Sequence, residues 1–85
     1  MEIVINSIAI AKNYTKKNEI KTITLENGEK KARIALSANV QASTGCKAFY
    51  AIIINNKIEK VSEMFTIVGE RTIEKFIRSL IEDLN

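Results

Sequence analysis

The sequence predicts an α+β fold: a twisted antiparallel sheet of four to five strands, followed by one C-terminal amphipathic helix packed on one face. Two observations lead to this prediction. Apolar and polar residues alternate on both sides of Asn27-Gly28, and residues 71–84 carry a helical pattern of apolar positions. The chain of 85 residues is expected to form a single domain, residues 1–85, because its length is near the small end of what folds alone.

The hairpin over residues 20–36 is the clearest of the predicted strand pairs. Asn27-Gly28 favours a type I′ turn, which needs a positive φ at both central positions. With these two residues as the loop, Leu25 lies opposite Lys30 and Ile23 lies opposite Ala32. One face of the hairpin is then apolar and the other is polar and basic. The apolar face carries Ile23, Leu25, Ala32, Ile34 and Leu36, and the other face carries Thr22, Thr24, Lys31, Arg33 and Ala35.

Residues 2–14 are expected to form the first strand. Both alternating sets of positions in this run are apolar, which suits a strand that is covered on two sides or contains a bulge. If this strand pairs with the hairpin, Ile8 and Ile10 lie beside Thr22 and Thr24. These two isoleucines would therefore join the face that the hairpin makes polar.

Two further strands are expected after the hairpin, followed by an ambiguous segment. The second hairpin strand continues to Val40, and an apolar strand follows over residues 48–54. Asn55-Asn56-Lys57 predicts another tight turn, since Asn tolerates the left-handed region. A shorter strand returns over residues 58–62. For residues 63–69 we favour a strand followed by a loop over the beginning of a helix.

The C-terminal helix is predicted from apolar residues that recur with helical spacing. These residues are Ile73, Phe76, Ile77, Leu80, Ile81 and Leu84. Glu70 favours the start of the helix, because a negative charge near an N-terminus interacts well with the helix dipole. We expect this helix to pack on the apolar face of the first hairpin.

One helix covers only about half of one face of such a sheet, since a helix is about 10–12 Å wide and strands lie about 4.8 Å apart. The remaining apolar surface is closed either by curling of the sheet or by a second copy in a C2 dimer, which we favour. The residues expected at such a protein interface are Ile8, Ile10, Tyr50, Ile52 and Ile54.

Candidate catalytic chemistry is sparse. The chain has no histidine, which excludes Ser-His and Cys-His pairs and removes the commonest zinc ligand. Cys46 lies beside Lys47 but has no base partner in the sequence. Glu26 and Glu29 flank a turn, where solvated carboxylates are more common than a general acid/base pair. We therefore expect no enzyme activity, no metal, no cofactor and no small-molecule substrate.

A binding protein is the remaining interpretation. The apolar surface that one helix leaves uncovered favours protein–protein interaction. The protein would then associate with itself or dock on a larger partner as an adaptor or inhibitor. The small chain, rich in Ile, Lys and Asn, suits an accessory protein of a phage, virus or plasmid. Nucleic-acid binding is the alternative, because basic residues and aromatic rings on a sheet can hold single strands. Its candidate residues are Lys12, Tyr14, Lys31, Arg33 and Lys47.

The expected location is the cytoplasm. Glu2 stands where a signal peptide would carry a basic region, and no apolar run approaches the roughly 20 residues of a membrane span. The one cysteine excludes an intrachain disulfide and suits a reducing compartment.

Overall fold

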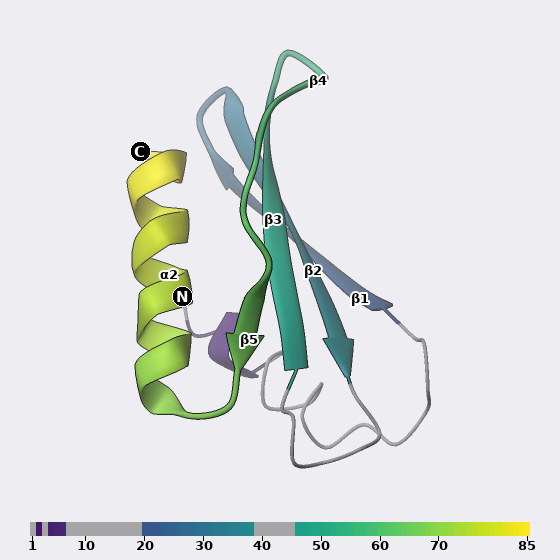
Figure 1. Ribbon diagram of the computed structural model, residues 1–85. Coiled ribbons are helices and arrows are strands. Elements are labelled where there is room, and N and C mark those ends of the chain that lie inside the picture. Colours follow the sequence, from purple (N-terminus) through teal and green to yellow (C-terminus); the bar gives the residue numbers. More distant parts are fainter. Residues whose placement is uncertain (1, 3, 7–19, 39–45) are drawn as a thin grey trace.

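The computed structural model describes residues 2, 4–6, 20–38 and 46–85, and it confirms the predicted α+β architecture (Figure 1). The described strands form one antiparallel sheet, and the C-terminal helix packs against it. In chain order the elements are β1 (Ile20–Asn27), β2 (Lys30–Ala38), β3 (Cys46–Ile54), β4 (Lys57–Val61), β5 (Phe65–Ile67) and α2 (Glu70–Leu84).

The N-terminal residues differ from the prediction. Residues 2 and 4–6 are helical, so the expected strand over residues 2–14 is wrong at these positions, and its remainder lies outside the described residues. Val4 is fully buried in the core, whereas Ile5 is exposed. Strand preferences of single residues amount to only about 1 kcal/mol, so burial of one side of a helical turn can outweigh them.

The β1–β2 hairpin has the predicted faces but a different turn. Its two-residue loop is Gly28-Glu29, one residue later than expected, and only Gly28 has a positive φ, of 62°. This favours a type II′ turn over the predicted type I′ turn. Leu25 now lies opposite Ala32 instead of Lys30. The pairing therefore moves by two residues on β2, and an even shift leaves every side chain on its predicted face.

The β3–β4 hairpin forms at the predicted turn. Asn55 and Asn56 have φ values of 51° and 63°, the conformation that a type I′ turn requires. After β4 the chain leaves the ladder and returns to it as β5, which also pairs with β3. Ser62 bridges the break, since its N–H donates to the carbonyl of Tyr50 and its hydroxyl accepts from the N–H of Tyr50, both at 2.9 Å. The strand favoured within residues 63–69 is thus confirmed as β5.

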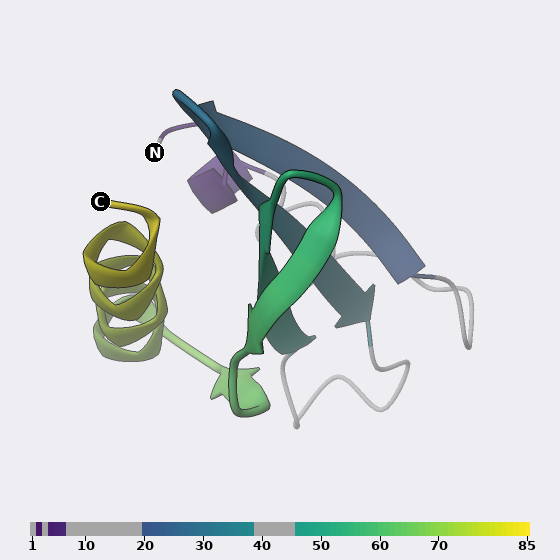
Figure 2. The ribbon, with the colours of Figure 1, turned by 90° about the horizontal axis from the view of Figure 1, so that it is seen from above.

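The core lies between the sheet and α2 (Figure 2). We call the side of the sheet that carries α2 the helix face, and the opposite side the outer face. Phe76 is fully buried and packs against two other rings, with centroids 5.9 Å from Tyr50 and 5.1 Å from Phe65. The predicted packing of the helix on the apolar face of the first hairpin is confirmed in part: Ile34 and Leu36 are fully buried beneath the helix, whereas Ile81 is exposed.

Candidate interaction surface

The outer face carries a row of apolar side chains along β3 and β4. In the register of this pair, Ile53 lies opposite Ile58 and Ala51 lies opposite Val61, so all four point to the same side. Ile58 and Val61 are 65% and 58% exposed. We call this row, which also includes the half-buried Phe49, the apolar stripe: Phe49, Ala51, Ile53, Ile58 and Val61.

Basic residues border the apolar stripe on β2. Arg33 lies opposite Ala51 and Lys31 lies opposite Ile53, so both point to the outer face beside the stripe. The ammonium of Lys31 is 3.8 Å from the carboxylate of Glu26, and both side chains are well exposed. Such an exposed pair is worth little, so the positive charge of Lys31 is only weakly compensated.

A hollow of about 260 Å³ lies at the end of the stripe where β5 begins. Its lining residues are Ile20, Ala35, Ser37, Lys47, Phe49 and Met64. The ammonium of Lys47 donates a hydrogen bond of 2.6 Å to the hydroxyl of Thr66, which keeps the charge at the rim of the hollow. Ile20 and Met64 are 62% and 59% exposed, so this end of the outer face is also mainly apolar.

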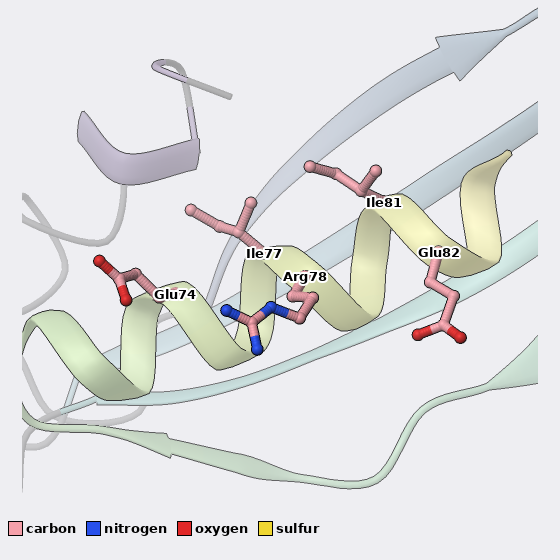
Figure 3. Close-up of a pocket in the computed structure, with 5 residues that line it drawn as sticks. All are labelled: Glu74, Ile77, Arg78, Ile81 and Glu82. Atoms are coloured by element: carbon pink, nitrogen blue, oxygen red, sulfur yellow. The ribbon is translucent and has the colours of Figure 1, made fainter.

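A second concave surface lies on α2, on the opposite side of the sheet. Ile77 and Ile81 point to one side of the helix, and Arg78 and Glu82 point to another (Figure 3). With Glu74 they line a shallow hollow of about 540 Å³. Ile77 partly packs against the core, whereas Ile81 is exposed.

A polar network fastens α2 to the strands beneath it. The buried hydroxyl of Tyr50 is 2.7 Å from the hydroxyl of Ser79 and donates a hydrogen bond to the carboxylate of Asp83. Lys60 on β4 donates to the same carboxylate at 2.9 Å. Burial and the hydrogen bond to Asp83 raise the pKa of Tyr50 to about 12. The hydrogen bonds from Tyr50 and Lys60 hold the pKa of Asp83 below its ordinary value.

This network connects α2 to β3 and β4. A tyrosine with a raised pKa keeps its proton at neutral pH, where it acts as a hydrogen-bond donor. Within the described part of the chain, no cluster of three or more His, Cys, Asp or Glu side chains is arranged to hold a metal ion. Among the same residues, no helix combines the length and the apolar character needed to cross a membrane.

The structure separates the residues expected at the protein interface. Tyr50 and Ile52 are buried under α2, with exposed fractions of 0% and 4%, and Ile54 packs against the same core. Tyr50 and Ile52 are therefore core residues of the monomer, and Ile54 is partly buried beside them. Ile8 and Ile10 lie outside the described residues.

The reason for this difference is the register of β3. Ile34 lies opposite Tyr50, so the even-numbered residues of β3 face the helix and the odd-numbered ones face outward. Both sets are apolar, and the sequence therefore gave no signal that the outward residues are Phe49, Ala51 and Ile53.

The described residues among those proposed for nucleic-acid binding lie on one face of the sheet. Lys31, Arg33 and Lys47 all lie exposed on the outer face. Lys12 and Tyr14 lie outside the described residues. The ring beside these cations is Phe49, two residues from Lys47 on the same strand, and not Tyr50.

No protein-family model, curated protein or solved structure matches this chain. Fold and surface together define its class: a small α+β domain with an antiparallel sheet, covered by a helix on one side and carrying an apolar, basic-edged surface on the other.

Proposed function

We propose that this protein is a non-enzymatic binding protein that docks on a larger protein through its outer face. The observation that supports the proposal is the apolar stripe, in which Ile58 and Val61 are more than half exposed. Contiguous apolar surface of this kind commonly marks an interaction site in soluble proteins. An apolar centre with a charged rim is also the usual composition of a protein interface.

The charges on this face favour one kind of partner. Lys31, Arg33 and Lys47 lie on the outer face, and Glu26 pairs only weakly with Lys31. A second copy docked face to face would bring these cations near one another, and like charges oppose association. The partner surface we expect is therefore apolar at its centre and acidic at its rim. An adaptor or an inhibitor would both act through such docking.

Nucleic-acid binding is the second candidate. Phe49 lies on the same face as Arg33 and Lys47, and a ring among cations can stack on a base. The rest of the stripe is aliphatic, however, and Ile58 or Val61 cannot provide the π-face on which bases stack. The composition of the stripe thus favours a protein surface over a single strand.

The experiment is selection of random displayed peptides on the immobilised protein, followed by affinity measurements. We expect selected peptides to combine apolar residues with Asp or Glu, and to bind Val61→Asp at least about tenfold more weakly than wild type. Ile81→Asp on α2 is the matched control and should bind normally. Selection on Arg33→Glu should enrich fewer acidic peptides.

Two results would overturn the proposal. One is equal affinity of the selected peptides for wild type and Val61→Asp. The other is tight binding of a labelled oligothymidylate, with an affinity that falls steeply as the salt concentration rises from about 50 to 200 mM. That result would show that the outer face binds nucleic acid.

A further inference from the structure

We propose that two copies of this chain pair through the edges of β1 that face away from β2 and form one continuous antiparallel sheet. Within the described residues, β1 pairs with β2 on one side and with no strand on the other. This surface is separate from the outer face, so the inference does not depend on the proposed function.

Half of the backbone groups of β1 point to this edge. Asn27 and Lys30 close the two-residue loop, and in such hairpins the closing pair exchanges both of its hydrogen bonds. The alternation along the strand then directs the N–H and C=O groups of Leu25 and Ile23 to β2. Those of Thr22, Thr24 and Glu26 point away from β2, to the edge on which β1 pairs with no other described strand.

Within the described residues, β1 itself lacks the features of length and sequence that usually prevent pairing. Strand β1 has eight residues, no proline and no bulge. The opposite edge is protected: β4 has five residues, three of them charged, and the β3–β4 ladder contains a register shift next to Ile52. Short, charged and bulged strands are common means of blocking an edge. Compared with β4, the edge of β1 is therefore better suited to the addition of a strand.

The helix face next to this edge is incompletely covered. Ile34 and Ala32 on β2 are fully buried, whereas their partners Ile23 and Leu25 on β1 are only half-buried. Helix α2 packs mainly against β5, β2 and β3, and it contacts β1 through Asn27 at the hairpin end of the strand, while the rest of β1 runs away from the helix (Figure 2). Additional cover over β1 would thus bury more apolar surface.

Two-fold symmetry makes this strand complementary to itself. When the two-fold axis is perpendicular to the sheet, residues that face each other across the two chains must point to the same side of the sheet. Odd-numbered residues of β1 can therefore face only odd-numbered ones, and even-numbered residues only even-numbered ones; we call this odd or even position parity. When Thr24 faces Thr24 of the other chain, Ile23 faces Leu25 of that chain and Thr22 faces its Glu26. The apolar residues then meet on the helix face, with no like charges directly opposed. Both α2 helices lie on this same face of the joint sheet.

Cysteine pairs test this register directly. In the proposed dimer the two Thr24 Cα atoms lie about 5.5 Å apart, within the range that a disulfide spans. The two Thr22 Cα atoms lie about 14 Å apart, because four residues of strand separate each from its own facing position. Both threonines are exposed on the same face of β1, so Thr22→Cys is a matched control for Thr24→Cys.

We expect wild type to be a dimer by light scattering at high micromolar concentration, and oxidised Thr24→Cys to form a covalent dimer in several-fold higher yield than Thr22→Cys. Thr24→Pro should give a folded monomer, because it removes an N–H that points away from β2. Val61→Asp should leave the dimer intact, which separates this surface from the outer face. A monomeric wild type, or equal cross-linking of the two cysteine variants, would overturn the inference even if Thr24→Pro fails to fold.

Discussion

The hydroxyl of Tyr50 donates a hydrogen bond to the carboxylate of Asp83, joining the centre of β3 to the last turn of α2. Lys60 contacts the same carboxylate from β4 at 2.9 Å, so one side chain of the helix connects two strands. At the same end of α2, the side-chain amide of Asn27 donates to the carbonyl of Leu84 at 2.9 Å. The C-terminal turn of the helix is therefore attached to β1 as well as to β3 and β4.

Asp83→Asn should lower the free energy of unfolding by about 1–2 kcal/mol, because it weakens two hydrogen bonds to a charged acceptor. Urea denaturation at neutral pH measures the change. Glu82→Gln, one residue away and exposed, is the control and should change stability by less than about 0.5 kcal/mol. Equal stability of Asp83→Asn and wild type would show that the network is not stabilising.

The difference between Asp83→Asn and wild type should depend on pH. Folding lowers the pKa of Asp83 below 3.8, so the carboxylate stabilises the fold above that pH and loses its effect as pH falls through the lower folded value. We therefore expect the two proteins to converge in stability at acid pH. A constant difference from neutral pH down through acid pH would contradict this account.

Tyr50 has the opposite pH dependence. Its pKa rises from 10.0 in the unfolded chain to about 12 in the fold, so its contribution is complete below pH 10 and is lost as pH rises through 12. Tyr14→Phe leaves Tyr50 as the only tyrosine, and its absorbance titration should then have a midpoint near 12 in the folded protein. A midpoint near 10 while the protein remains folded would contradict the assignment.

The two described glycines outside the helix should respond differently to alanine. Gly28 has a φ of 62°, so Gly28→Ala should cost about 1 kcal/mol of stability through backbone strain alone, since a Cβ there meets no atom within 4 Å. Gly69 has an extended φ of −170° and equally open surroundings, so Gly69→Ala introduces no such strain and should cost less, about 0.5 kcal/mol, because alanine is less favourable than glycine at an N-cap. Thermal denaturation compares them, and equal effects would argue against strain at the turn.

A side chain that caps α2 should stabilise the protein. Gly69 occupies the N-cap position without a side-chain hydrogen bond, while Thr72 accepts from its N–H at 3.1 Å. Gly69→Ser would supply the missing half of this capping arrangement, and we expect a gain of about 0.5–1 kcal/mol. Gly69→Ala, which cannot accept a hydrogen bond, is the control in the same denaturation experiment.

The sequence predicted the elements whose periodicity is unambiguous. The faces of the β1–β2 hairpin are correct even though its turn is one residue later, because the actual pairing preserves parity. The helix is correct because its apolar residues recur over three turns. In contrast, β3 is apolar at both parities, and only packing against β2 and α2 determines that Tyr50 points inward and Phe49 outward. The same limit applies to the N-terminus, where residues 4–6 are helical and Val4 is buried, although the alternating positions of this run are apolar in both sets.

The candidate surface could be predicted only in part. Lys31 and Arg33 follow from the hairpin pattern and lie on the outer face as expected. The apolar stripe beside them depends on the orientation of β3 and on the register of β4, which contains an irregularity next to Ile52. A bulge reverses the facing of the residues beyond it, and the short run from Ile58 to Val61 gives no signal of its own.

The most direct test of the central claim is a map of backbone amide chemical-shift changes when a selected acidic and apolar peptide binds the protein. We predict that the largest changes fall on Phe49, Ala51 and Val61, with Arg33 beside them. Changes confined to α2 around Ile77 and Ile81 would contradict the proposal that the outer face is the binding surface.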